Sequence, residues 1–543
     1  MSFLPDGSPR EAGDEAGSIR EERHIPAFVL VSGKYKLHFA QISCMMKKNG
    51  RWEVASAINL AGISDFRCES WVEEDGKVKM EKRTSDRKQS AETGNMTVGN
   101  PYTLMIAFAL PVFLSQVFQQ MYNTADAFLV GRYLGTNALA AVTSSGTLIF
   151  LMTSLFYGIA MGGGVMISRY FGANAGEQVS RAIHTLLAFG VVSGFALTLV
   201  GVGFTPVFLS WMQTDPEVMP EAVQYFRYYF AGAFAMVMYN ICCSIMNALG
   251  DSRRPLYYLI FSSILNVVLD CVFLGAFGWG VWAAAVATVI SQAASVVLCM
   301  AHLMRRGNLF TVELSKIRFH KRMLVEIIRN GLPAGIQNSV IGFANVIVQS
   351  QINSFGKLAM AAYGVHAKIE GFAFLPIISF NLACTTFISQ NLGAGQHERA
   401  KKGARFSILA ASLLAEFVGI IYYVFAPQLV GMFDATAGVV DLGARQARTV
   451  ALFYFLLAFS HSVAAVCRGA GKAFVPMCVM LSIWCVLRIS YIIVVMRLTG
   501  DISLIYWAYP LTWAISSVIY LIYYLRSDWV HGFDSVKVAA QQS

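Results

Sequence analysis

Charged side chains are scarce in this chain. Asp, Glu, Lys and Arg make up 14% of its 543 residues, whereas hydrophobic residues make up 56%. Soluble globular domains carry about 25% charged residues, so this composition excludes a soluble protein over most of the length and indicates a membrane protein. The net charge of +10 does not indicate a nucleic-acid partner, because Lys and Arg lie in short connections between apolar stretches.

Signatures of common catalytic and nucleotide-binding sites are missing as well. The string nearest to a GxxxxGK[ST] phosphate loop, Gly469-Ala470-Gly471-Lys472, lacks its spacing and its Ser or Thr. No GxSxG or HExxH motif occurs. The ten cysteines show no CxxC or Cys/His metal spacing, so we interpret them as small core residues. We therefore expect no enzyme activity, no direct use of ATP and no cofactor.

The chain does contain an internal repeat with a constant offset of 221 residues. Seven residues of the first half recur in the second, namely Gly135, Ile167, Ser168, Gly172, Ala173, Gly250 and Pro255 as Gly356, Ile388, Ser389, Gly393, Ala394, Gly471 and Pro476. A constant offset indicates a duplicated half. In an apolar chain this pattern is typical of transporters, whose two halves rock around a central site.

Twelve apolar segments are each long enough to cross a bilayer, which needs about 20 residues. Their approximate limits are 101–131, 138–170, 181–206, 220–249, 255–275, 280–304, 324–353, 358–391, 403–426, 440–468, 474–497 and 502–526. The connections after spans 4, 6 and 8 carry most of the Lys and Arg, so we expect both termini to be cytoplasmic. The predicted fold is an all-α polytopic membrane protein with two pseudo-symmetric six-helix bundles.

The spans define the expected domains. They are an N-lobe over residues 96–306, a basic cytoplasmic linker over 307–323, a C-lobe over 324–526 and a cytoplasmic tail over 527–543. Residues 1–95 are polar and mixed in charge. We interpret them as an extension that is disordered or not made in the cell, since Met80 and Met96 both precede the first span. A small soluble domain is the alternative.

Two acidic residues lie inside the predicted spans of the first half, Asp126 in span 1 and Asp270 in span 5. Both spans run from inside to outside. At about 1.5 Å per residue the two carboxyl groups reach a similar depth in the outer half of the membrane. A charge in hydrocarbon is costly unless it is paired, hydrated or neutralised. The two acids are therefore predicted to share one functional site.

Polar neighbours extend this candidate site. Asn266 precedes Asp270 by one helical turn, Tyr122 precedes Asp126 by one turn, and Thr288 of span 6 falls at a comparable depth. Carboxylate, amide and hydroxyl oxygens suit Na⁺, and two neighbouring buried carboxyl groups also suit a proton. Other polar residues of these spans either line the same cavity or pack between helices, namely Gln119, Gln120, Asn240 and Asn247. The acids do not recur in the second half, where Tyr491 corresponds to Asp270.

Several strings resemble the multidrug and toxic compound extrusion (MATE) transporters. Residues 110–113, 119–126 and 130–135 are similar to the first helix of that family. Residues 247–251 with Pro255, and 266–270, resemble the fourth and fifth helices of its bacterial DNA-damage-inducible F-like branch. Residues 390–395 resemble the eighth helix. The resemblance covers about residues 96–526 and places the chain in the multidrug, oligosaccharidyl-lipid and polysaccharide exporter superfamily.

The resemblance implies a secondary active exporter in a bacterial cytoplasmic membrane. It would exchange amphipathic or cationic drugs for Na⁺ or H⁺ by alternating access. In this branch the cation site matches Asp126, Asn266, Asp270 and Thr288, and further lining positions match Tyr225 and Asn240. Pro111 matches a proline linked to bending of helix 1. One family asparagine falls on Cys243 here, which removes a hydrogen-bonding group.

We expect a monomer in the lipid bilayer that acts on small organic cations and binds no nucleic acid. The alternative function is a flippase for lipid-linked oligosaccharide, which shares the superfamily architecture. An anionic lipid head group would require Arg or Lys in the first-lobe cavity, where this sequence places acids. The sequence names neither the drug nor the coupling ion.

Overall fold

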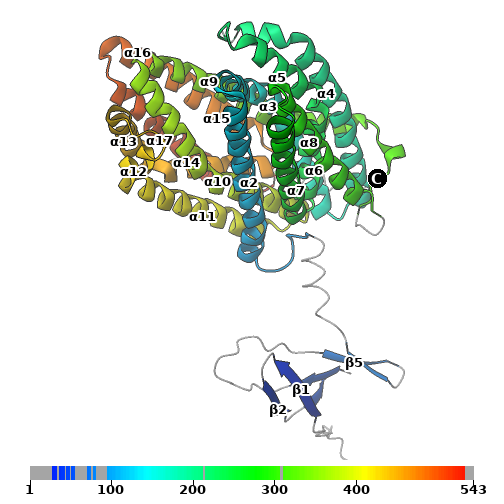
Figure 1. The fold of residues 1–543 in the computed structure, drawn as a ribbon. Helices are drawn as coiled ribbons and strands as arrows, with labels where there is room; N and C mark the ends of the chain where they lie inside the picture. The colour runs from blue at the N-terminus through cyan, green and yellow to red at the C-terminus, as the bar shows by residue number, and fades with distance from the viewer. Residues whose placement is uncertain are drawn as a thin grey trace, which may run out of the picture. The chain divides into compact units, whose positions relative to one another are not determined.

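The computed structural model describes six strands between residues 27 and 80, and then residues 94–211, 214–305 and 310–531 (Figure 1). The chain forms two compact units, Met1–Gln89 and Ser90–Ser543. The first contains two antiparallel sheets, one of two strands and one of four in the order β3-β4-β5-β6. Their bounds are β1 Ala27–Gly33, β2 Lys36–Ile42, β3 Met45–Lys48, β4 Arg51–Val54, β5 Ser70–Glu74 and β6 Lys77–Met80.

Most of residues 1–95 lies outside the described residues, and so does the tail beyond residue 531. The strands show regular pairing within this extension, which was expected to be disordered or not made in the cell. Whether the extension is made in the cell, and whether it is an independent soluble domain, both stay predictions.

The second unit is built from apolar helices. Among the described residues, eleven helices are long and apolar enough to cross a membrane, and a bent pair supplies a twelfth. The first six spans, here called lobe 1, are α2 Pro101–Leu134, α3 Thr136–Gly172, α4 Gly176–Trp211, α5 Met219–Ala231 with α6 Ala233–Ala248, α7 Arg253–Asp270 with the π-helical η1 Cys271–Ala276, and α8 Val281–Leu303.

The second six spans, here called lobe 2, follow a short 3₁₀ turn, η2 Leu314–Lys316. They are α9 Lys321–Asn353, α10 Lys357–Gly393, α11 His397–Val424, α13 Ala437–Val450 with η3 Ala451–Phe453 and α14 Tyr454–Gly469, α15 Phe474–Met480 with the π-helical η4 Leu481–Leu487 and α16 Arg488–Leu498, and α17 Ile502–Arg526. A short helix, α12 Ala426–Gly431, follows α11. The predicted all-α membrane fold is confirmed for this unit.

Spans 4 and 10 differ from the uninterrupted helices that the sequence suggested. Span 4 is bent by 49° between α5 and α6. The break falls at Gly232, where a Cβ atom would collide with Val289 of α8. The missing side chain thus permits a close approach of two spans. Span 10 is interrupted by the 3₁₀ turn η3.

The 221-residue repeat is visible as equivalent hydrogen bonds. The Ser168 hydroxyl donates to the carbonyl oxygen of Ala248 in lobe 1, at 2.9 Å. The repeat-related Ser389 hydroxyl donates to the carbonyl oxygen of Gly469 in lobe 2, also at 2.9 Å. Both bonds join the end of the second span to the end of the fourth. The two lobes therefore share their internal packing.

Each lobe also contacts the other through its first helix. The helix α2 packs on α10 of lobe 2, and its counterpart α9 packs on α3 of lobe 1. Figure 1 shows α2 between α4–α8 on one side and α10–α17 on the other. The α3–α9 contact is the most extensive between any two helices of the described chain. A Cβ atom at Gly158 or Gly162 of α3 would collide with the backbone at Gly335 or Gly331 of α9. Small residues thus bring these backbones together, as in other membrane helix pairs.

Further contacts join the lobes at the helix ends that are predicted to be cytoplasmic. Residues 94–100, here called the strap, lead into α2 and run between the lobes. The Gln390 side chain of α10 accepts from the backbone N–H of Met96 at 2.8 Å and donates to the carbonyl of Ala248 at 3.0 Å. Arg399 of α11 donates to the carbonyls of Gly99 and Met96. Among the described residues, hydrogen bonds between lobes lie at this end and extend outward as far as Ser154 and Ser339.

Candidate functional site

The two acidic residues predicted to share a site lie together inside lobe 1. Asp126 comes from α2 and Asp270 from the last turn of α7. Their exposed fractions are 7% and 0%. The two carboxyl groups lie close enough to interact directly, and two buried like charges at such proximity favour a proton or another cation between them. The helical depth argument therefore placed the two groups correctly.

An amide and a hydroxyl group complete the polar side of this pair. The Asn266 side chain lies 3.4 Å from the Thr288 hydroxyl, and both residues are almost fully buried. With its amide turned by 180°, Asn266 donates to a carboxylate oxygen of Asp270 at 3.1 Å and accepts from the Thr288 backbone N–H at 3.3 Å. This orientation satisfies both ends of the amide, so we assign it. All four residues predicted to bind the cation are thus brought together.

Three tyrosines surround the acids. The Tyr122 side chain lies near Thr288 and interacts electrostatically with both carboxyl groups. Tyr225 of α5 is close to the same two acids. Its ring stacks with Tyr229 at a centroid distance of 5.9 Å, and Tyr229 also faces Asp126. The sequence analysis missed Tyr229, although its spacing of four from Tyr225 places both rings on one face of α5.

Two oxygen atoms in this arrangement have no hydrogen-bond partner. They are Oδ1 of Asp126 and Oδ1 of Asp270, both buried. Buried polar atoms are normally paired, and an unpaired carboxylate oxygen is a ready ligand for a hard cation. Among the described residues, no cluster of three or more His, Cys, Asp or Glu side chains occurs. The pair therefore suits a monovalent cation or a proton better than a tightly held transition metal.

A change of helix type follows directly after Asp270. The six residues of η1 form a π-helical turn, which ends the span toward the predicted outer side. Such turns are rare and occur often at functional sites. The corresponding residues of lobe 2 are α-helical, since its π-helical segment η4 lies earlier in the span.

The other residues that were predicted to line the cavity lie outside this cluster. Gln119 is exposed and Gln120 is half-buried. Asn240 donates to the carbonyl oxygen of Met236 on its own helix at 2.9 Å, whereas the Asn247 side-chain oxygen is buried without a partner. Pro111 lies inside α2, which continues through it from Pro101 to Leu134. Roles for these residues in substrate binding or bending stay predictions.

Lobe 2 has a different group in the corresponding place. Tyr509 corresponds to Thr288 by the repeat, and Arg488 follows the position that corresponds to Asn266. The Arg488 guanidinium is buried, donates to the Thr512 hydroxyl at 2.8 Å and lies over the Tyr509 ring at 4.5 Å. The carboxyl group of Glu370 is its electrostatic neighbour. The Arg488 guanidinium thus places a fixed positive charge in the part of lobe 2 that corresponds to the acidic site of lobe 1.

Replacement of Asn266 is expected to weaken binding of the coupling ion without abolishing it. In Asn266→Ala the Asp270 carboxyl group loses a neutral partner, which costs about 1–2 kcal/mol. We expect the apparent affinity for the coupling ion to fall about 5- to 30-fold, measured as the ion concentration that gives half-maximal transport. Asn353→Ala is the control, because that exposed amide at the end of α9 accepts from the Gln349 side chain of its own helix, and it should leave the ion dependence unchanged. Equal ion affinities for wild type and Asn266→Ala would contradict the assignment.

Known proteins resemble this chain over its whole membrane part. The MatE family model matches it twice, at residues 111–272 and 333–494, which together exceed half of the chain. The probable multidrug resistance protein YoeA of Bacillus subtilis is 29% identical over 429 residues, which cover 77% of this chain and 92% of that protein. The probable multidrug resistance protein NorM of Thermotoga maritima is 24% identical and covers 70% and 82%.

Solved structures share the fold. A multidrug resistance MATE family transporter in an outward-facing conformation superposes with a TM-score of 0.74 at 21% identity. The match covers 83% of this chain and 99% of that one. The membrane part of this chain therefore shares its overall fold with that structure.

Proposed function

This chain belongs to the MATE family of membrane transporters, and on that premise we propose that it exports amphipathic or cationic small molecules in exchange for Na⁺ or H⁺. It is a multi-pass transport protein rather than an enzyme. The names of its relatives support multidrug efflux. The coupling ion and the class of substrate are parts of the proposal.

The proposed coupling mechanism rests on one observation, which is the difference in buried charge between the two lobes. Lobe 1 holds a pair of buried carboxyl groups with two unpartnered oxygens, and lobe 2 holds a guanidinium in the corresponding region. The acidic pair binds either the coupling ion or, through its negative charge, the cationic substrate. Because a bound Na⁺ or H⁺ neutralises that charge, its binding weakens the hold on the substrate. Exchange follows from this competition.

The lobes are joined at the end that is predicted to be cytoplasmic, so we assign this conformation to the outward-facing state. Return to the inward-facing state requires the bonds between Gln390, Arg399 and the strap to break. These are bonds to backbone carbonyls and a backbone N–H, which water can replace when the end opens. We further propose that the protein acts as a monomer in the bacterial cytoplasmic membrane with both termini inside.

Transport by the purified protein in liposomes tests the proposal. A fluorescent organic cation is followed while an inward Na⁺ gradient and an inward pH gradient are imposed separately. At least one gradient should drive movement of the dye, and the Asp126→Asn variant should not respond to it. Dye movement that ignores both gradients would exclude ion-coupled exchange. Movement of a labelled lipid-linked oligosaccharide instead of the dye would favour the flippase alternative.

A further inference from the structure

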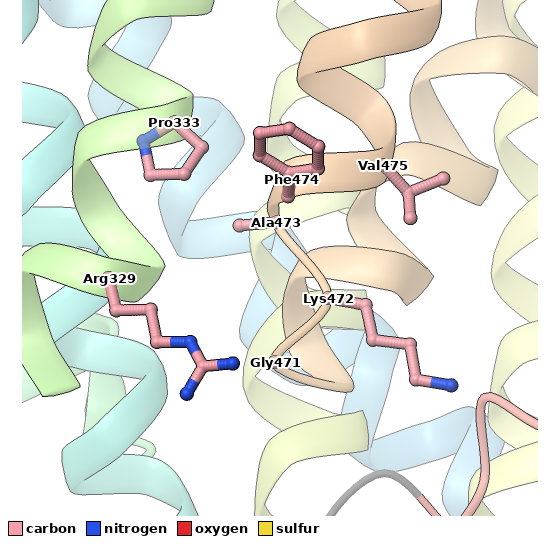
Figure 2. Close-up of a pocket in the computed structure, with 7 residues that line it drawn as sticks. All are labelled: Arg329, Pro333, Gly471, Lys472, Ala473, Phe474 and Val475. Atoms are coloured by element: carbon pink, nitrogen blue, oxygen red, sulfur yellow. The ribbon is translucent and has the colours of Figure 1, made fainter.

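A groove with a volume of about 440 Å³ lies between α9 and the turn that joins α14 to α15. Figure 2 shows its lining: Arg329 and Pro333 on α9, Gly471, Lys472 and Ala473 in the turn, and Phe474 and Val475 at the start of α15. The groove is separate from the acidic site, which lies in lobe 1. It has the size of a small-molecule binding site.

The two ends of the groove differ in chemistry. Pro333, Phe474 and Val475 make one end apolar, and the Phe474 side chain is 64% exposed. The Arg329 guanidinium lies at the other end and extends toward the turn (Figure 2). Arg329 has no ion-pair partner within the described part of the chain. Lys472 contributes its stem, and its ammonium group donates to the carbonyl oxygen of Asp528 at 2.7 Å.

The depth of the groove matches the membrane interface. The charged residues of α9 end at Arg329, and no charged residue follows in the rest of the helix. The turn after α14 is likewise the point where the chain leaves and re-enters the apolar region. From this pattern we infer that the cation lies at head-group level and that the apolar end of the groove extends into the hydrocarbon.

The repeat explains why the groove is open. Gly471 corresponds to Gly250 of lobe 1, and both have positive φ angles, 73° and 84°. At Gly250 the backbone of Gly94 from the strap covers the turn so closely that a Cβ atom would collide with it. The segment before α9 takes another course, because the backbone N–H of Glu313 donates to His184 of α4. The segment before α9 therefore does not cover the turn at Gly471 in the way that the strap covers the turn at Gly250.

We propose that this groove binds an anionic phospholipid of the inner leaflet, with its phosphate at Arg329 and an acyl chain along Pro333, Phe474 and Val475. Guanidinium groups bind phosphate through paired hydrogen bonds, and basic pockets between membrane helices on this side bind anionic head groups. The same stretch of α9 carries Gly331 and Gly335, which contact α3. The lipid therefore contacts the helix that joins the two lobes.

Native mass spectrometry of the full chain in detergent tests the site. Dioleoyl phosphatidylglycerol and dioleoyl phosphatidylcholine are titrated separately, and the first lipid adduct is quantified. We expect the wild type to bind phosphatidylglycerol at least ten times more tightly than phosphatidylcholine, and Arg329→Gln to lose this preference. Arg181→Gln is the control, because Arg181 is an exposed arginine of α4 that pairs with Glu177 outside the groove. It should keep the preference.

A second variant separates the lipid from a free anion. Val475→Trp fills the apolar end and keeps Arg329, so it should weaken phosphatidylglycerol binding while the protein stays monodisperse. Addition of 10 mM inorganic phosphate should not displace the lipid. Equal binding of the two lipids by the wild type, an unchanged preference in Arg329→Gln, or displacement by phosphate would each overturn the proposal.

Discussion

Asp126→Asn is expected to reduce ion-driven export at least a hundredfold, to the level of liposomes without protein. The substitution keeps the size of the side chain and removes its negative charge. Asp270 then has no acidic partner, and a cation held between two carboxyl groups loses one charged ligand. Since ligand charge dominates the binding of hard cations, we expect the ion site to fail rather than weaken.

The measurement is dye uptake in liposomes under the gradient that drives the wild type. The amount and the monodispersity of the protein should be unchanged, because removing one of two adjacent like charges relieves repulsion. Asp434→Asn is the matched control, since Asp434 is a half-buried residue in the loop after α12 that accepts from the Thr436 backbone N–H at 2.9 Å. Wild-type export by Asp126→Asn would remove Asp126 from the coupling mechanism.

Gly162→Val is expected to open the predicted cytoplasmic end of the lobes. The new side chain collides with the α9 backbone at Gly331, and overpacking of this kind costs about 1–3 kcal/mol. That energy corresponds to a shift of about 5- to 150-fold in the ratio of closed to open molecules. Transport should fall by about fivefold or more, because one of the two alternating states becomes sparsely populated.

The opening can be followed with spin labels at Arg181 of lobe 1 and Lys401 of lobe 2, two exposed residues near this end, in a background without native cysteines. Gly162→Val should lengthen their mean separation. Gly203→Val is the control, because a Cβ atom there meets no atom within 4 Å. An unchanged separation in Gly162→Val would show that the α3–α9 contact does not hold the closed end together.

Much of this architecture follows from local patterns in the sequence. The repeat predicted two lobes, and Ser168 and Ser389 show that it describes real packing. Helix rise alone placed Asp126 and Asp270 at the same depth, because both lie on spans that run in the same direction. Asn266 was predicted from its spacing of one helical turn before Asp270, and Thr288 from its comparable depth on span 6. The GxxxG spacing of Gly158 and Gly162 is typical of close helix packing, and both residues contact α9.

Other features depend on contacts that no local pattern encodes. The strap meets Gln390 nearly 300 residues later in the chain, and the bonded atoms are largely backbone groups that every residue possesses. The bend at Gly232 depends on the approach of Val289 from another span. Arg488 lies inside the predicted span 474–497, but its partner Thr512 lies on a different helix. Such pairings become visible only in three dimensions.

The buried Arg488 has a consequence for the electrical work of transport. A guanidinium keeps its proton and does not exchange with the solution, so lobe 2 retains this charge throughout a cycle. Under the proposed mechanism, the membrane potential then acts on the cations that enter and leave lobe 1. Moving one positive charge across the membrane changes the free energy by about 2.3 kcal/mol per 100 mV. A one-for-one exchange of monovalent cations moves no net charge, so only the concentration gradients drive it. Two ions per substrate would make the same exporter voltage-dependent.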